Sequence, residues 1–371
     1  MKVLHVISDE NIGGAGVLLL NLLEHFDPSR IESCVALPRG SALIPRFEAL
    51  EVPVFPLAHN CDRFTPSSVR ELLRLIHAES IDLVSANAAL SARIAGRLGG
   101  VRVVHTRHCC FPPEGVWRFP PMCALGGLFN RLLSDRVIAT AEAAANDLCR
   151  LGVPREKVTV IINGSAPVRK VGEGELDAAR SSWGIPRDAF CIGICARLVP
   201  CKGHATFLHA AKLLCDALPD RVFCFLLAGE GELREELEGL SQALGIGDRV
   251  KFLGFLEDTA LFYRIIRINV NCSIGTETSC LALSEGMSAG VPAVASDYGG
   301  NPAMLGDCRV GRLFPKGDHR ALAEQLREIA EQPALEKNMR VAALETYGRR
   351  FTPQRMADEV VSLYESLFSS N

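Results

Sequence analysis

The sequence predicts an α/β protein built from two doubly wound, Rossmann-like domains, and three observations lead to this prediction. Short apolar runs alternate with amphipathic stretches along the chain, as they do where helices cover both faces of parallel sheets. This rhythm breaks once, in residues 163–182, which are rich in Gly, Ala and charge and are predicted to be a linker. The length of 371 residues suits about two domains.

The first half begins directly with an apolar run that meets polar residues by Ser8, so we expect a strand there and not a signal peptide. The predicted buried strands of this half are 3–7, 33–37, 83–86, 101–106, 136–139 and 158–162. The amphipathic stretches 17–25, 67–79 and 142–151 are predicted to be helices.

The second half repeats the pattern after the linker. Its predicted strands are 191–195, 222–228, 250–253, 268–271 and 291–295. The predicted domains are therefore 1–165 and 166–352, followed by a last segment, 353–371. Ligands of such sheets bind beyond the carboxyl ends of the strands, so we expect a site in a cleft between the two domains.

Composition excludes several classes of protein. The formal net charge of -3 does not favour bulk binding of nucleic acid. The 14 cysteines include no Cys-x-x-Cys pair, which argues against zinc ribbons and thioredoxin-like chemistry and fits a reducing cytosol. No apolar run approaches the roughly twenty residues of a membrane-spanning helix. We therefore predict a cytoplasmic protein and leave weaker attachment to a membrane open.

The segment that contains Glu277 and Glu285 is the most informative. A helix is predicted from about Leu281, with Thr278 or Ser279 as its N-cap. Its free amides would face a phosphate, and the helix dipole would favour the negative charge. At this spacing the two carboxylates would contact different parts of one ligand and would not lie side by side as a pair. A capped surface helix with two solvated acids is the alternative interpretation.

Arg197 and Lys202 form the second candidate group. A strand is expected to end near Arg197, and a helix is expected to begin after Gly203. Two fixed cations at a strand end can neutralise the charge that appears on a departing diphosphate, which Mg²⁺ does in other enzymes. An exposed Arg and Lys on a turn would look the same in the sequence.

Three further segments are less specific. Gly229-Glu230-Gly231 follows a predicted strand, where glycines let a backbone approach a ligand. The loop 13–16 does not fit the dinucleotide pattern Gly-x-Gly-x-x-Gly, and it suits a tight turn as well as a phosphate or acceptor site. His105 and His108 end a strand of the first domain, where a histidine is more often structural than functional.

Together and in this order, these segments resemble the retaining glycosyltransferases of the GT-B fold known as family 4. Two glutamates separated by seven residues match Glu277 and Glu285, and an Arg, four residues and Lys-Gly match Arg197, Lys202 and Gly203. The remaining matches are Gly-Glu-Gly at 229–231, Gly-Gly-Ala at 13–15, Thr-x-His at 106–108 and Asn-Gly at 163–164. The resemblance covers nearly the whole chain and implies the GT-B architecture.

The resemblance implies roles in a transfer that needs no metal ion and retains the anomeric configuration. The donor would be a nucleotide-diphosphate sugar, most often a UDP-sugar, bound by the C-terminal domain. Glu285 would hydrogen-bond the ribose. Glu277 would contact the donor sugar and support positive charge at its anomeric carbon, while Arg197 and Lys202 would hold the diphosphate.

The implied catalytic set is completed by His108, which would approach the donor sugar from the acceptor side. The first domain would hold a glycan, lipid-linked or other hydroxyl acceptor of cell-envelope or polysaccharide biosynthesis. The final helix, about 353–368, would cross back onto that domain. The other implied donor-binding positions are Gly14, Gly229, Gly231, Ser279, Cys280 and Leu281.

Two positions depart from the family pattern. The family often has a Phe-Gly-Leu run after the first glutamate, where this chain has Thr278-Ser279-Cys280-Leu281, and it often has a glutamate where this chain has Ala303. Neither change removes a charge assigned to catalysis, but both leave the identity of the donor sugar open.

Residues 109–129 are apolar, aromatic and proline-rich, and they lie in the stretch 93–136 with seven arginines and two acids. We hypothesise that they meet a lipid-linked or anionic acceptor at the inner face of the membrane, although an ordinary packed loop would have the same composition. Two rival functions keep the fold: a UDP-sugar epimerase, which would act on the donor alone, and a non-catalytic nucleotide-sugar-binding protein.

Overall fold

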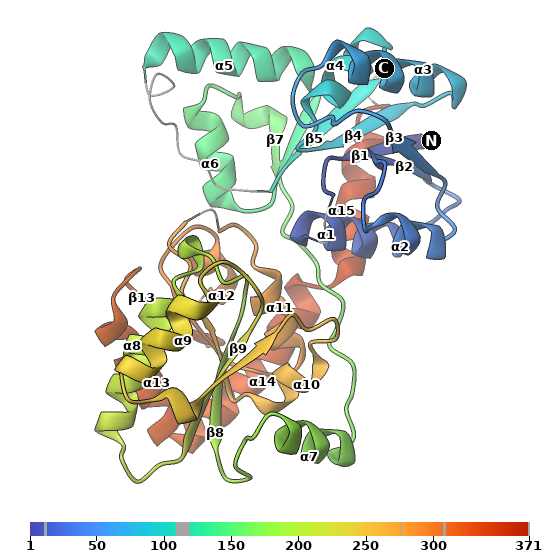
Figure 1. Cartoon of the computed structure of the whole chain (residues 1–371). Helices are drawn as coiled ribbons and strands as arrows, with labels where there is room; N and C mark the ends of the chain where they lie inside the picture. Colours follow the sequence, from blue (N-terminus) through green and yellow to red (C-terminus); the bar gives the residue numbers. More distant parts are fainter. Residues whose placement is uncertain (11–12, 109–118, 276, 307–308, 370–371) are drawn as a thin grey trace. The chain divides into compact units, whose positions relative to one another are not determined.

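The computed structural model describes residues 1–10, 13–108, 119–275, 277–306 and 309–369, and it divides into two compact units (Figure 1). The N-terminal unit comprises Met1–Ser165 and Thr352–Asn371, and the C-terminal unit comprises Ala166–Phe351. Each unit is a parallel sheet with helices on both faces, which confirms the predicted fold class.

The sheet of the N-terminal unit has the order β3-β2-β1-β4-β5-β6-β7, and every neighbouring pair is parallel. Its strands are β1 (Lys2–Ile7), β2 (Glu32–Pro38), β3 (Val54–Leu57), β4 (Leu83–Asn87), β5 (Arg102–Arg107), β6 (Arg136–Ala139) and β7 (Val158–Val160). Its helices are α1 (Gly14–Leu23), α2 (Ile44–Ala49), α3 (Pro66–Ala78), α4 (Leu90–Leu98), α5 (Pro120–Leu133), α6 (Glu142–Arg150) and α15 (Pro353–Ser366).

The apolar runs of this sheet are continuous because both of its faces are covered. Successive side chains of a strand point to opposite faces. Val3 of β1 accordingly packs in one core cluster with α1 and α15, while its neighbour Leu4 packs in a second cluster with α3 and α4. A strand buried in this way has no polar side, so its pattern is apolar throughout and does not alternate.

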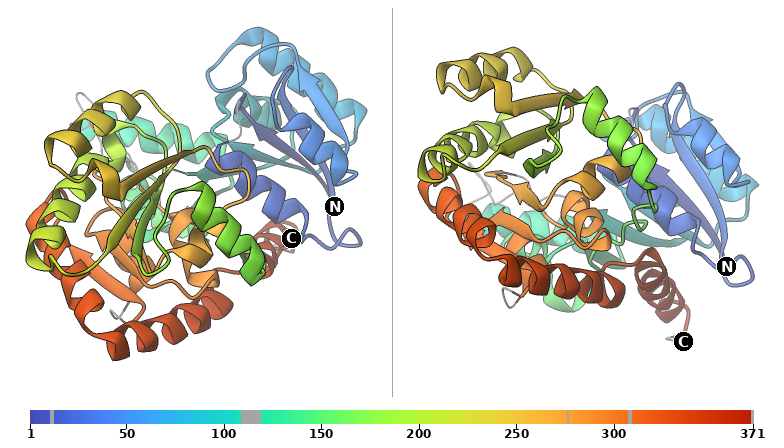
Figure 2. Two further views of the ribbon diagram at one scale, coloured as in Figure 1. Left: turned by 60° about the horizontal axis from the view of Figure 1, so that its bottom comes forward. Right: turned by 90° about the horizontal axis from the view of Figure 1, so that it is seen from below.

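The final helix α15 belongs to the N-terminal unit, although about 190 residues separate it from the rest of that unit in the sequence. Figure 2 shows this dark red helix beside the blue elements near the N-terminus. Met356 and Val360 pack in the same core cluster as β1 and α1. The hydroxyl of buried Tyr364 donates to Ser85 Oγ of β4 at 2.9 Å. Arg30 and Glu365 add a surface ion pair of 2.6 Å.

The sheet of the C-terminal unit has the order β10-β9-β8-β11-β12-β13 and is also parallel. Its strands are β8 (Phe190–Cys195), β9 (Phe223–Ala228), β10 (Val250–Gly254), β11 (Ile268–Asn271), β12 (Ala293–Ser296) and β13 (Gly311–Phe314). Its helices are α7 (Glu173–Ser182), α8 (His204–Ala217), α9 (Arg234–Ala243), α10 (Ala260–Ile265), α11 (Leu281–Ser288), α12 (Asn301–Leu305), α13 (His319–Glu331) and α14 (Pro333–Arg350).

Two segments contain helices that the sequence analysis does not predict. The predicted linker 163–182 includes helix α7, whose Glu175 side chain accepts a hydrogen bond from the Gly172 amide and so caps the helix start. The segment 109–129, for which membrane contact is hypothesised, contains the beginning of α5, and its two prolines stand in the first turn of that helix, where a missing N–H costs nothing. Residues 109–118 of that segment lie outside the described residues. Over the described part of the chain, no helix is long and apolar enough to cross a bilayer.

Two edge strands, β3 and β13, were not predicted. β3 contains Pro56, and β13 contains a charged residue, Arg312, so neither has the continuous apolar run of the inner strands. Both pair with a single neighbour at the end of their sheet. Edge strands tolerate proline and charge because one side of them has no partner in the sheet.

The packing of α15 predicts that Tyr364 stabilises the N-terminal unit. Tyr364→Ala should lower the free energy of unfolding by about 3–5 kcal/mol because it leaves a cavity under β4, and Tyr364→Phe by about 1 kcal/mol because it removes one hydrogen bond. Hydrogen exchange of the β1 and β4 amides would measure both changes. Ser362→Ala, on the exposed side of the same helix, is the control, and equal protection in all three variants would contradict the prediction.

Candidate functional site

The candidate residues of the C-terminal unit gather where the strand order of its sheet reverses. From β8, the chain runs outward to β9 and β10 on one side and to β11, β12 and β13 on the other. Loops that leave neighbouring strands at such a point diverge and open a crevice at the carboxyl edge of the sheet. The loop after β8 carries Arg197 and Lys202, and the loop after β11 carries Glu277.

The side chain of Glu277 is the centre of this group. The residue is buried, with 6% of its surface exposed. Its Oε2 atom lies 2.8 Å from Lys202 Nζ. The same oxygen accepts hydrogen bonds from Ser273 Oγ at 2.6 Å and from Asn271 Nδ2 at 3.3 Å. Three donors from the two loops therefore converge on one carboxylate oxygen.

These contacts keep both partners charged. Burial by itself raises the pKa of Glu277, but the Lys202 ammonium and the donors of Ser273 and Asn271 outweigh it, so the pKa lies below its ordinary value. Burial likewise lowers the pKa of Lys202, but the charge of Glu277 outweighs it and the pKa is raised. The two directions agree and describe a buried ion pair that persists at neutral pH.

Two glycines allow these loops to pack backbone against backbone. Gly203, with φ of 68°, follows Lys202 and begins helix α8, and a Cβ there would overlap the carbonyl oxygen of Cys272. Gly299, with φ of 61°, lies against Glu277, and a Cβ there would overlap the Glu277 carbonyl oxygen. Both positions thus require a left-handed backbone and a close approach, which glycine supplies.

The turn 229–231, after β9, supports the Arg197 loop from the other side. The amide of Leu198 donates to the carbonyl of Glu230 at 2.9 Å. A Cβ on Gly229 would overlap the Ala196 carbonyl oxygen, and one on Gly231 would overlap that of Leu198. The two predicted glycines therefore position the backbone on either side of Arg197.

Arg197 itself is exposed, in contrast to Lys202. Over the described ranges of the chain, no hydrogen bond or ion pair is found for its guanidinium. The structure therefore holds Lys202 in an ion pair and leaves the side chain of Arg197 exposed, and the phosphate-binding role of both residues stays a prediction.

The start of helix α11 differs from its prediction. The N-cap is Cys280, not Thr278 or Ser279, and its side chain makes no capping hydrogen bond. Its amide instead donates to Met304 Sδ at 3.1 Å, and its sulfur accepts from Asn271 Nδ2 at 3.0 Å. The first amide of the helix, that of Leu281, has no intrahelical acceptor, as at any helix start, and this end can meet an anion.

Glu285 lies on α11 and has different neighbours from Glu277. Burial raises its pKa to about 7, although the hydroxyl groups of Tyr263 and Thr259 partly offset this effect. The two carboxylates thus occupy separate environments, as their spacing predicts. Glu277 is ionised by its ion pair, whereas Glu285 is about half protonated at neutral pH.

In the N-terminal unit, His108 follows β5 and its Nε2 lies 2.9 Å from Asn87 Oδ1, at the end of β4. Burial lowers the pKa of His108 to about 4, so the ring is neutral at pH 7. Both side chains line a small cavity together with Thr106, Thr140 and Ile161.

Gly14 of this unit is the first residue of α1, and an added Cβ there would have no neighbour within 4 Å among the described residues. Its helix begins without a side-chain cap, because the N-cap is Gly13. The open start of α1 therefore leaves room for a ligand, but Gly14 is not required by packing.

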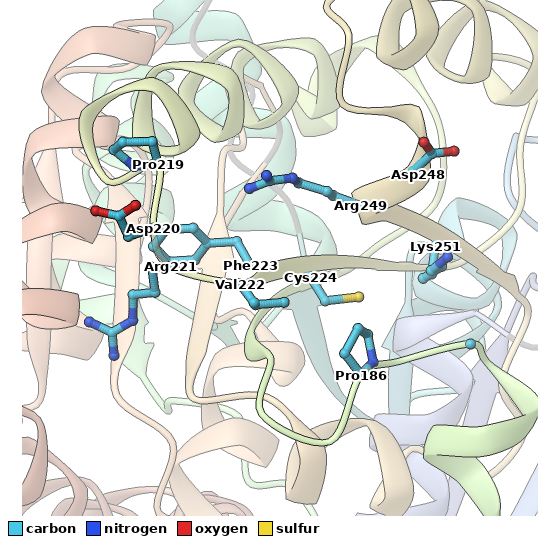
Figure 3. A pocket seen from close by; sticks show the side chains of 11 residues that line it. Pro186, Pro219, Asp220, Arg221, Val222, Phe223, Cys224, Asp248, Arg249 and Lys251 are labelled. Carbon is cyan, nitrogen blue, oxygen red and sulfur yellow. The ribbon is translucent and has the colours of Figure 1, made fainter.

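A hollow of the C-terminal unit lies away from the candidate residues. Figure 3 shows its lining, which includes Arg221, Arg249 and Lys251. These residues precede or begin β9 and β10, so the hollow lies at the amino edge of the sheet. Because ligands of such sheets bind at the opposite, carboxyl edge, the hollow is not part of the candidate site.

Sequence analysis missed the residues that hold Glu277. Asn301 Nδ2 donates to Asn271 Oδ1 at 3.3 Å, and the Ser273 amide donates to the same oxygen at 2.9 Å. Ser296 Oγ in turn donates to the Ser273 carbonyl at 2.6 Å. The available signal was the pair of asparagines in the otherwise apolar strand β11, because buried polar side chains require partners.

Most of the chain matches the profiles of two known protein families. Residues 12–167 match the profile of Glycosyltransferase Family 4, and residues 176–346 match that of Glycosyl transferases group 1. The chain is 30% identical over 281 residues to a D-inositol 3-phosphate glycosyltransferase of Streptomyces avermitilis. That alignment covers 71% of this chain and 60% of the relative. Over 166 residues it is 34% identical to a phosphatidyl-myo-inositol mannosyltransferase of Mycobacterium leprae, with 43% of each chain covered.

Among solved structures, the chain is similar to Anabaena Alr3699/HepE in complex with UDP-glucose. The TM-score is 0.84 at 23% identity, and the match covers 99% of this chain and 100% of the other. At this identity the likeness shows a shared fold.

The buried ion pair predicts a non-additive pair of substitutions. Lys202→Met should lower the free energy of unfolding by about 3–5 kcal/mol, because it leaves the Glu277 charge buried without its partner. Glu277→Gln in the same chain should recover part of this loss, since it removes that charge. Denaturant unfolding of both single variants and the double variant would measure the coupling.

Lys212→Met is the matched control for this cycle. Lys212 pairs with Asp216 on the surface of α8, where an ion pair contributes less than about 1 kcal/mol. Purely additive losses for Lys202→Met and Glu277→Gln would show that the two residues do not form an ion pair in solution.

The raised pKa of Glu285 predicts that part of the free energy of unfolding depends on pH. Its pKa of about 7 in the folded chain lies above the ordinary value of 4.5, so the folded state binds the proton more tightly. The resulting stability is fully present below pH 4.5 and is lost as the pH rises through 7. Glu285→Gln should therefore gain stability relative to the wild type between pH 5 and 8, by at most about 3 kcal/mol.

Denaturant unfolding across this pH range would measure the difference between wild type and variant. Glu236→Gln, an exposed glutamate on α9, is the control and should follow the wild type. If Glu285→Gln also follows the wild type, Glu285 titrates as an ordinary carboxyl group.

Proposed function

The chain belongs to glycosyltransferase family 4, and we propose that it transfers a hexosyl unit from a nucleotide-diphosphate sugar, with UDP as the carrier, to a hydroxyl group of an acceptor. We propose further that the transfer retains the anomeric configuration and needs no metal ion. The observation that carries the proposal is the buried Lys202–Glu277 ion pair at the point where the strand order reverses.

The diphosphate would bind at Lys202, Arg197 and the amide end of α11. Lys202 has three donors, so it can keep its contact with Glu277 while another N–H bond meets a phosphate oxygen. Arg197 is exposed and can turn towards the second phosphate with its planar fork. These cations would stabilise the charge on the departing nucleoside diphosphate, as preorganised donors do in other enzymes.

Glu277 would face the sugar from the same side. Its pKa is held below the ordinary value, so it is negatively charged when the donor bond breaks. Positive charge then develops at the anomeric carbon, and a fixed carboxylate nearby stabilises it. Ser273 and Asn271 occupy one of its oxygens, which leaves the other, Oε1, for hydroxyl groups of the sugar.

Glu285 would accept hydrogen bonds from the ribose hydroxyl groups. Such bonds favour the ionised carboxylate, whereas burial in the free protein favours the protonated one. Donor binding at neutral pH would therefore release a proton from Glu285.

The acceptor would be held by the N-terminal unit, with His108 near the reacting hydroxyl. A neutral His108 that donates to Asn87 presents a hydrogen-bonding ring that carries no cationic charge. The mannosyltransferase of Mycobacterium leprae carries a lipid acceptor in its name, which supports a lipid-linked or glycan acceptor for this chain.

A thermal-shift panel of UDP-, GDP- and ADP-sugars tests the donor site. A ligand that binds the folded state raises the melting temperature by mass action. We expect the largest rise with a UDP-sugar, a rise that Arg197→Gln reduces without changing the melting temperature of the free protein. Arg187→Gln, an exposed arginine of the same unit, is the control. An undiminished rise in both Arg197→Gln and Lys202→Ala would refute the phosphate assignment.

Incubation with the donor alone separates transfer from epimerisation. We expect the sugar nucleotide to keep its configuration until an acceptor is added. Conversion of the donor to its epimer without acceptor would overturn the proposed transfer while leaving the donor site in place.

A further inference from the structure

Two cysteines lie side by side in the sheet of the C-terminal unit. Cys191 of β8 is the register partner of Cys224 of β9. Both belong to one core cluster, whereas the residues that follow them, Ile192 and Phe225, belong to the cluster on the other face of the sheet. Successive side chains of a strand alternate between the faces, so the two thiols point to the same side from directly paired positions.

The two thiols form a hydrogen-bonded pair. The S–H of Cys224 donates to Cys191 Sγ, and Cys191 in turn donates to the carbonyl oxygen of Ala189 at 3.6 Å. The bond from Cys224 lowers the pKa of Cys191, and the guanidinium of Arg180 lowers it further, which together outweigh burial. The pair therefore releases a first proton more readily than an isolated buried thiol does.

Other buried cysteines behave as ordinary apolar side chains. Cys34 and Cys61 of the N-terminal unit donate to the backbone carbonyls of Val3 and Ile7. Burial raises the pKa of each of these two thiols to about 12. A thiol that stays protonated is a poor nucleophile, so these residues serve as an internal reference for the pair in the C-terminal unit.

The pair can be reached from solvent through the hollow at the amino edge of the sheet. Cys224 is one of its lining residues, together with Arg249 and Lys251 (Figure 3). The hollow has a volume of about 180 Å³, which is ample for a molecule little larger than water, whose share of liquid volume is ~30 Å³. The bond to Cys191 and burial raise the pKa of Cys224, and the Lys251 ammonium opposes that rise.

The paired positions suit a disulfide bond. Neighbouring strands lie about 4.8 Å apart, within the range of about 4.4–6.8 Å that separates the Cα atoms of disulfide-bonded cysteines. Closing the bond draws the two Cβ atoms nearer than they stand in a regular sheet. Strained disulfides of this kind are the readily reduced ones, so the oxidation would be reversible.

We propose that Cys191 and Cys224 form a redox-active dithiol, which hydrogen peroxide oxidises to a disulfide. A thiolate sulfur attacks one peroxide oxygen, the O–O bond breaks, and the other oxygen takes up a proton and leaves as water. The second sulfur then attacks the sulfenic acid, which forms the S–S bond and releases a second water. The two thiols lose two electrons and two protons, and one peroxide becomes two waters.

The first step belongs to Cys224, because this residue lines the hollow. Its proton can pass to Cys191 along their hydrogen bond, which places the thiolate on the sulfur that the peroxide reaches. Cys191 is then the resolving sulfur. This chemistry does not involve the carboxyl edge of the sheet and is independent of the proposed transfer.

Oxidation of the reduced full chain with hydrogen peroxide, followed by alkylation of the remaining thiols and peptide mass spectrometry, tests this proposal. We expect a peptide pair linked through Cys191 and Cys224, which forms before any link to Cys34 or Cys61 and which dithiothreitol cleaves. Absence of this link in the folded chain would overturn the proposal. So would a mixture of links in which this one is not enriched.

Two variants test the partnership, with the loss of the alkylatable Cys224 thiol as the measured rate. Cys191→Ala should slow this loss at least about tenfold, because no partner takes the proton and the thiolate share falls by about one pKa unit or more. Lys251→Gln should slow it about two- to fivefold, as expected for one partly exposed charge. Lys337→Gln, exposed on α14, is the matched control and should react like the wild type.

An unchanged rate in Cys191→Ala would show that the two thiols act independently and would overturn the proposal. None of these outcomes bears on the donor site.

Discussion

The buried carboxylate of Glu277 imposes a condition that the loops around it must meet. A charge removed from water is costly unless an opposite charge and hydrogen-bond donors replace the solvent. Lys202 comes from the loop after β8, and Ser273 and Asn271 come from the end of β11. Because these groups belong to neighbouring strands, the correct pairing of β8 with β11 and the solvation of Glu277 depend on each other.

The two units share the parallel-sheet architecture, but the carboxyl edges of their sheets provide different electrostatic environments. In the C-terminal unit, charged and hydrogen-bonding groups meet at the carboxyl edge around Glu277. In the N-terminal unit, the corresponding edge carries a neutral His108, hydrogen-bonded to Asn87, in a small and mainly apolar cavity. Ion pairing keeps Glu277 and Lys202 charged in the C-terminal unit, whereas burial keeps His108 neutral in the N-terminal unit.

The sequence predicts the inner strands and the edge strands β7 and β10, but it misses the edge strands β3 and β13 and the helices that begin in two segments, for physical reasons. Strands covered on both faces are continuous apolar runs, so β1, β4, β8 and β9 stand out, whereas Pro56 and Arg312 hide the edge strands β3 and β13.

Charged candidates such as Lys202 and Glu277 were found because their spacing is distinctive. Asn271 and Ser273 were missed because their role depends on where the loop folds back, which no local pattern records. The predicted N-cap of α11, Thr278 or Ser279, was wrong. The N-cap is Cys280, whose amide donates to Met304 Sδ and whose sulfur accepts from Asn271 Nδ2.

The glycines that bring the loops together also limit how this protein can change. At Gly203 and Gly299 the space for a side chain is taken by the carbonyl oxygens of Cys272 and Glu277. Any larger residue at either position would displace the backbone of a whole loop. Outward-facing side chains of the same loops, such as Arg197, are not limited in this way, because they can change without moving the backbone.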